Sequence, residues 1–145
     1  MNLDWLNEFQ DPYLKKPTGK GIFLSGIALG FIASCQKGKS KSITDAPLFK
    51  KLPFGKLQKR DIKRQLADIP VMLKAYEIPY SYEITNIANA AGELLLTGSE
   101  EMGIDGNFIF SLAFLNAWKY FYLLYPDHQK KDQNQMETME ENHEF

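Results

Sequence analysis

The chain has 145 residues, of which 44% are apolar and 13% aromatic, enough for one globular domain with a modest core. Its single cysteine, Cys35, excludes an internal disulfide and a cysteine-clustered metal site. The first residues lack the basic-then-apolar order of a secretory signal, so we expect a reducing, cytoplasmic setting.

Charge is strongly segregated along the chain, although the net charge is only −1. Residues 12–64 hold thirteen of the seventeen Lys and Arg and only two acids, which gives this segment a charge of +11. Residues 65–145 hold four lysines and thirteen acids and carry −9. Such segregation is typical of a protein that contacts a polyanion with one part, although a solvated basic face has the same composition.

The N-terminal part of the sequence predicts two helices. Residues 3–9 place Trp5, Leu6 and Phe9 on one stripe, which predicts a short helix. Thr18 is the expected N-cap of the next helix, whose sequence GIFLSGIALGFIASCQ is apolar over most of its length. This run of about sixteen residues is too short to span a bilayer, so we expect a buried core helix.

A stripe of small residues follows one side of this core helix. Gly26 and Gly30 lie on it, between Ile22 and Ala33. Because a flat stripe lets a second helix approach closely, the pattern predicts a tight helix–helix contact here.

The next segment, KGKSKSITDAPLFKKLPFG, predicts a basic loop around one short helical turn, APLFKKL. A helix is then expected from about Lys56 to Ala67, with its apolar residues facing inward. Pro70 is expected to open a separate short helix through Tyr76, because proline is tolerated in a first turn.

The C-terminal half predicts two longer helices and a tail. Residues 81–98 form a helix with Ser81 as N-cap, and the mostly apolar residues 106–126 form a central core helix around which the others pack. Residues 127–145 lack apolar periodicity and are expected to be a disordered acidic tail or a solvated helix. Since no period-two alternation competes, we expect an all-α bundle of about five to six helices in one domain, residues 1–126.

One motif, ASCQKGKS at residues 33–40, fits a permissive phosphate-binding loop if Ala33 replaces the first glycine. Such a loop needs a buried strand before it and a helix that begins at its Gly-Lys-Ser. Here the preceding residues have helical periodicity, and Pro47 interrupts the residues that follow. We interpret the match as accidental.

The sequence does not favour catalysis or a bound cofactor. His128 and His143 both lie in the polar tail, away from the predicted core. Lys37 and Lys39 follow closely after Cys35 and could lower the pKa of its thiol, but no histidine lies near it in sequence, so a buried structural cysteine is favoured. We expect a protein that is not an enzyme and holds no metal.

The basic segment instead predicts a nucleic-acid interface. Four cations recur on one side of the predicted 56–67 helix, and further lysines lie among Gly and Ser residues before it. Flexible lysines suit phosphates as point charges and read no bases. The candidate contact residues are Lys37, Lys39, Lys41, Lys50, Lys51, Lys56, Lys59, Arg60, Lys63 and Arg64.

The order of four segments resembles a known family. GIFLSGIALG (21–30), APLFKKL (46–52), LQKRDIKR (57–64) and FIFSLAFLNAWKYF (108–121) resemble the helical C-terminal part of the type I-B CRISPR large subunit. That part is also produced alone, by internal translation initiation, as the small subunit of the Cascade complex. The resemblance spans roughly residues 20–125 and rests on element order and apolar pattern. The equivalent segment of type I-D systems is similar, so both types stay open.

This resemblance implies a role without catalysis. Several copies of such a subunit line the inner side of the crRNA-bound backbone and contact neighbouring copies and the backbone and large subunits. They help to hold the crRNA–DNA heteroduplex with the target strand and the displaced non-target strand, and so stabilise the R-loop. Guide pairing reads the sequence in these complexes while protein supplies charge. No membrane is involved.

Two other classes of function remain open from the sequence. A nucleic-acid-binding regulator would carry a helix-turn-helix, but no recognition helix with Asn, Gln and Arg at its start is evident. A protein-only adaptor would use the same basic face to bind an acidic partner. Salt-dependent DNA binding by the isolated protein distinguishes the adaptor from the nucleic-acid binder.

Overall fold

The computed structural model describes residues 1–40 and 42–133, and this part of the chain is helical without strands, which confirms the all-α class. It holds more helices than the five to six expected, since three 3-10 helices and a helical segment at 126–133 accompany the six labelled α-helices. The 3-10 helices are η1 (Asp4–Glu8), η2 (Tyr13–Lys15) and η3 (Ile43–Asp45). The α-helices are α1 (Pro17–Gln36), α2 (Pro47–Lys51), α3 (Lys59–Ala75), α4 (Ser81–Thr97), α5 (Gly103–Leu115) and α6 (Ala117–Leu124).

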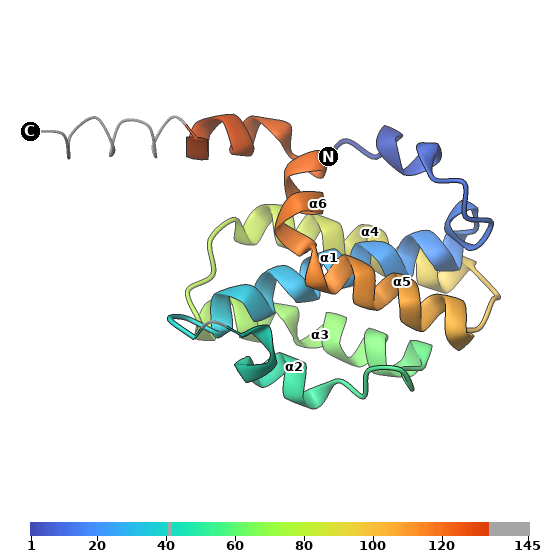
Figure 1. Ribbon diagram of the computed structural model, residues 1–145, viewed down its shortest axis with the longest axis horizontal. Helices are drawn as coiled ribbons and strands as arrows, with labels where there is room; N and C mark the ends of the chain where they lie inside the picture. Colours follow the sequence, from blue (N-terminus) through green and yellow to red (C-terminus); the bar gives the residue numbers. More distant parts are fainter. Residues whose placement is uncertain (41, 134–145) are drawn as a thin grey trace, which may run out of the picture.

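Helix α1 is the central element of the fold, and the predicted core helix is therefore confirmed. Helices α2 to α6 all pack against it, with α4 and α5 making the most extensive contacts (Figure 1). Every residue from 21 to 33 is buried, as expected of a helix that is apolar all round. Helix α1 is long and apolar enough to match a membrane span, since an 18-residue stretch of it has a mean hydropathy of 1.4. However, 83% of this stretch is buried inside the fold.

The small-residue stripe of α1 packs against α5, as predicted. A Cβ added at Gly26 would lie 2.7 Å from Ala113 Cβ, and one added at Gly30 would lie 2.8 Å from Phe114 Cα. Both distances are too short for any real side chain. The two glycines therefore set how closely α1 and α5 approach.

The prediction of one central helix at 106–126 is wrong. This run forms α5 and α6, separated at Asn116, whose backbone leaves the helical region at φ −117° and ψ 28°. The Asn116 side-chain amide donates to the Leu112 carbonyl oxygen at 2.9 Å, a local bond that competes with regular helix geometry. The central position belongs to α1, because α5 and α6 each bury only one side against it.

The prediction that Pro70 begins a new helix is also wrong. Helix α3 continues through Pro70 to Ala75, although an interior proline removes one backbone hydrogen bond and typically costs about 3 kcal/mol. Ile69 and Leu73 are buried on either side of it, so core packing holds this turn helical. The helix also begins later than expected, at Lys59, so Lys56 lies outside it.

Both predicted N-caps are wrong. Pro17 is the first residue of α1, where proline is favoured, and Thr18 lies buried in the first turn. Tyr80, in the left-handed conformation at φ 60°, precedes α4. The Ser81 hydroxyl donates to the Ile78 carbonyl oxygen at 3.4 Å instead of accepting from an amide of the helix.

The two ends of the described chain pack against the α1 and α6 region. Leu6 of η1 is buried, and the Trp5 ring stacks on Tyr120 with a centroid separation of 5.8 Å. After α6, residues 126–133 are helical, and the His128 ring lies 4.7 Å from that of Tyr80. His128 is thus not remote from the core as predicted, while residues 134–145, with His143, lie outside the described residues.

Candidate nucleic-acid interface

The outward side of α3 carries the cations that the sequence predicted for this helix. Arg60, Lys63 and Arg64 are exposed, while Ile62 on the opposite side is fully buried. Asp61, the one acid among them, accepts a hydrogen bond from the Gln58 backbone N–H at 2.8 Å and caps the helix. The charge of this acid is therefore engaged at the helix terminus rather than with the neighbouring cations.

Lys59 has a different role from the one predicted. Its Nζ donates to the carbonyl oxygen of Gly98 at 3.0 Å, and Gly98 is the C-cap of α4. A cation at this position satisfies a free carbonyl and complements the negative end of the helix dipole. We therefore assign Lys59 to the contact between α3 and α4.

The segment between α2 and α3 is anchored to the core. The Phe49 and Phe54 rings stack at a centroid separation of 4.7 Å, and Phe54 meets Phe114 edge-on at 5.2 Å. The Leu57 backbone N–H donates to Asn107 Oδ1 at 2.8 Å, and Asn107 Nδ2 donates to the Leu57 carbonyl oxygen at 3.1 Å. This anchoring holds the exposed residues Lys50, Lys51 and Lys56 on a fixed backbone.

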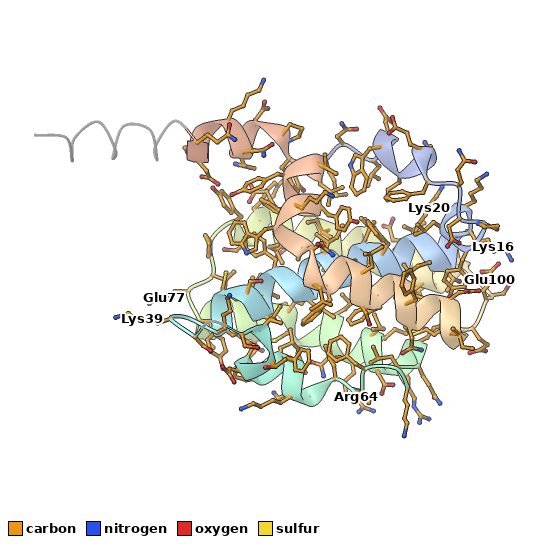
Figure 2. All side chains as sticks on the ribbon, viewed as in Figure 1. Lys16, Lys20, Lys39, Arg64, Glu77 and Glu100 are labelled. Atoms are coloured by element: carbon orange, nitrogen blue, oxygen red, sulfur yellow. The ribbon has the colours of Figure 1, made fainter. Side chains whose placement is uncertain are left out.

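Figure 1 shows α2, the segment that follows it and α3 on the same side of α1. Their exposed cations therefore share this side of the molecule, and Arg64 points outward there in Figure 2. We call this set the basic side. It consists of Lys50, Lys51, Lys56, Arg60, Lys63 and Arg64.

Two of the lysines after α1, Lys37 and Lys39, do not join the basic side. Lys37 is the C-cap of α1, and Lys39 is exposed at one end of the molecule, where Figure 2 also labels the acid Glu77. Cations at a helix C-terminus are favoured by the helix dipole without any ligand. Lys41 lies outside the described residues.

The motif at residues 33–40 does not form a phosphate-binding loop. It begins in the last turn of α1 and continues into a turn, so a helix ends here instead of beginning. Backbone carbonyl groups, not N–H groups, are free at such an end, and they repel phosphate.

The described cations make no ion pair with the described carboxylates. In residues 1–40 and 42–133, the one close contact between a basic side chain and a carboxylate joins His128 Nε2 to Glu83 Oε1 at 3.3 Å, and it is an ion pair only when the imidazole is protonated. Among the described residues, the cations of the basic side therefore have no carboxylate within ion-pair distance. Lys16 and Lys20, which the sequence did not single out, lie at the other end of the molecule from Lys39, beside Glu100 (Figure 2).

Burial raises the pKa of two groups that could act as nucleophiles, Cys35 and Tyr13. Burial raises the pKa of the Cys35 thiol, which opposes formation of the thiolate despite the lysines nearby. Burial, followed by the charge of Glu100, raises the pKa of Tyr13 to about 12. Across the part of the chain that the structure describes, no group of three or more His, Cys, Asp or Glu side chains is placed to hold a metal ion.

One polar cluster was not foreseen from the sequence. Asp132 accepts hydrogen bonds from the hydroxyls of Tyr80 and Tyr122, each at 2.7 Å, and these bonds lower the pKa of its carboxyl. The cluster joins the 126–133 segment to α6 and to the residue before α4. Its members are far apart in the sequence and follow no periodic pattern, so no local signal predicts it.

Comparison with known proteins now identifies the family. A family model described as the C-terminal domain of CRISPR-associated protein TM1802 (cas_TM1802) matches residues 2–125. No curated protein and no solved structure matches the chain. The matched residues run from the N-terminal 3-10 helix to the end of α6 and include the whole basic side. The chain belongs to the family of the C-terminal domain of CRISPR-associated protein TM1802.

Proposed function

We propose that this chain is a non-catalytic subunit of a CRISPR RNA-guided complex that holds nucleic acid through its phosphates. The observation that carries the proposal is the basic side, whose six exposed cations have no described carboxylate partner, in a chain of a CRISPR-associated family. Such charges lower the free energy of a bound polyanion most when no internal acid competes for them.

The proposed contact reads no bases. Four of the six cations of the basic side are lysines, which bind phosphates as point charges and read no bases. In an RNA-guided complex, base pairing with the guide reads the sequence and the protein supports the strands. The basic side suits the backbone of a crRNA–DNA heteroduplex or of a displaced single strand.

Within such a complex we assign the chain to the small-subunit position, in a Cascade assembly of type I-B. Several copies would then follow the crRNA-bound backbone in the cytoplasm and contact the backbone and large subunits. The resemblance of element order supports this position, and the acidic charge of residues 65–145 suits contact with basic neighbours.

A role without chemistry agrees with the titratable groups described above. Burial raises the pKa of Cys35, and the His128 ring is packed among aromatic rings, 4.7 Å from Tyr80 and 5.8 Å from Tyr125. His128 Nε2 lies 3.3 Å from Glu83 Oε1 and is thus held within the fold by a contact to α4.

The experiment that tests the proposal is a salt titration of binding. Affinity of the purified chain for labelled single-stranded DNA is measured by fluorescence anisotropy over a range of salt concentrations. If about four to six phosphates are engaged, the log–log slope should be roughly −3 to −4, with similar values for unrelated sequences. A flat salt response would favour the protein-only adaptor, and strong preference for one sequence would contradict backbone contact.

A pair of variants assigns the binding to the basic side. Arg60→Ala with Arg64→Ala should reduce the salt slope by about one to two units and weaken binding to all sequences alike. Lys130→Ala with Lys131→Ala removes the same charge from exposed positions elsewhere and should have a smaller effect. Equal losses in the two double variants would show that only total charge matters.

A further inference from the structure

An open groove with a volume of about 530 Å³ lies between α3 and α4. Small residues line both sides of it, and Ala67, Ala88 and Gly92 are too short to fill the space between the two helices. A Cβ added at Gly92 would have no atom within 4 Å, so the space beside this residue is free. Leu66 and Leu96 complete the apolar part of the lining, and Leu96 is 78% exposed.

The groove is a fixed feature of the fold, because both of its sides are helices. Lys59 Nζ on α3 donates to the Gly98 carbonyl oxygen at the C-terminal end of α4, at 3.0 Å, and this bond joins the two helices close to Leu96. The volume lies within the range of roughly 300–1,000 Å³ that is typical of small-molecule sites. A group of the size of a nucleobase can therefore enter without a rearrangement of the backbone.

The groove is continuous with the basic side. Lys63 belongs to both, and exposed Arg60 and Arg64 lie within one helical turn of it on α3. On the α4 side the lining includes Glu93, which makes no ion pair among the described residues. The charge of Glu93 repels phosphate, so an anionic chain is directed to the α3 side and a group attached to that chain reaches across toward α4.

We propose that this groove receives an unpaired base of a nucleic-acid strand whose phosphates bind the basic side. The inference rests on the proposed function and adds to it a site for the base. Because an apolar lining lies directly beside three cations, the occupant has to join an apolar group to an anionic chain. A nucleotide of a single strand has this combination, whereas a paired base is held inside the stack. Contact with the face of a base tolerates every sequence.

Two strands that carry the same phosphates but differ in their bases test the proposal. Affinity of the 145-residue chain is measured by fluorescence anisotropy for labelled oligothymidine of about twelve nucleotides and for a strand of equal length built from abasic sugars. At the same salt concentration the wild type should bind oligothymidine about tenfold more tightly, since one contacted base contributes a factor of this order. The salt slope should be equal for the two strands, because their phosphates are the same.

Gly92→Leu places a side chain in the groove. The added Cβ meets no atom within 4 Å, so the helical circular dichroism should be unchanged. This variant should bind oligothymidine no more tightly than the abasic strand, while its affinity for the abasic strand should equal that of the wild type. The matched control is Ala75→Leu, at an exposed position of α3 outside the groove lining, which should keep the tenfold preference. Lys63→Ala should weaken binding of both strands alike.

The outcomes separate this inference from the proposed function. Binding of neither strand would overturn both, whereas equal binding of the two strands by the wild type would overturn the base site alone. A preference for oligothymidine that survives both Gly92→Leu and Leu96→Ser would also overturn the base site, because the base contacts would then lie elsewhere on the surface. The same result is expected if the groove holds an apolar side chain of a protein partner instead of a base.

Discussion

Replacing Gly30 with alanine tests the close contact of α1 with α5. The new Cβ would lie 2.8 Å from Phe114 Cα and 2.9 Å from Ala117 Cβ, and it would also meet the Phe114 carbonyl oxygen. Carbon atoms in favourable contact are about 3.5–4.0 Å apart, so α1 and α5 must separate by roughly 0.5–1 Å. Because two of the three neighbouring atoms belong to the Phe114 backbone, no side-chain rotation relieves the clash.

The expected magnitude follows from two opposing terms. Overpacking of a close contact costs about 1–3 kcal/mol, and the backbone neighbours place this site in the upper part of that range. Alanine is better than glycine in a helix by about 1 kcal/mol. The net loss in the free energy of unfolding should be about 1–2 kcal/mol, or a melting temperature lower by roughly 3–8 °C.

Urea denaturation followed by circular dichroism measures this loss, with Gly92→Ala as the matched control. Gly92 also lies within a helix, α4, but its added Cβ would have no atom within 4 Å. That variant should be more stable than the wild type by about 0.5–1 kcal/mol, because only helix propensity changes. If Gly30→Ala were as stable as Gly92→Ala, the argument that this glycine sets the helix distance would be refuted.

Three further outcomes follow from the described contacts. Asn107→Leu leaves the buried Leu57 backbone N–H and carbonyl without partners and should lower the free energy of unfolding by about 2–4 kcal/mol in urea, whereas Asn89→Ala at an exposed position should not. The lowered pKa of Asp132 means that its carboxylate stabilises the fold above its ordinary pKa and stops doing so as pH falls through the lowered value. Asp132→Asn should therefore melt below the wild type at pH 7, with a difference that shrinks below about pH 4; a difference independent of pH would contradict this assignment. Burial of Cys35 predicts slow reaction with a thiol reagent at neutral pH, and a rate equal to that of a free thiol would show that the side chain is accessible.

The sequence by itself determined the helical class, the core helix and the glycine contact. These features depend on local periodicity: an apolar repeat along residues 21–33 requires burial, and small residues four apart require a close neighbour. The segregation of charge likewise follows from residue order alone, and the structure places six of the thirteen cations of residues 12–64 on one side of the molecule.

The positions of the helix boundaries were decided by tertiary contacts. Pro70 lies inside α3 because Ile69 and Leu73 are buried around it, and Asn116 divides α5 from α6 within a run that is apolar throughout. Local signals for starting or stopping a helix are worth about 1–3 kcal/mol each, so the burial of one or two large side chains outweighs them.

The composition of the basic side was also decided in three dimensions. Lys59 donates to the C-cap carbonyl oxygen of α4, 39 residues away, and Asp61 caps the start of its own helix, α3. Lys37 and Lys39 lie beyond the end of α1. The net charge of a segment can be counted from its sequence. A basic surface forms only where the fold brings the exposed cations of that segment to one side of the molecule. That arrangement depends on contacts such as the Asn107–Leu57 pair, fifty residues apart, which no local pattern encodes.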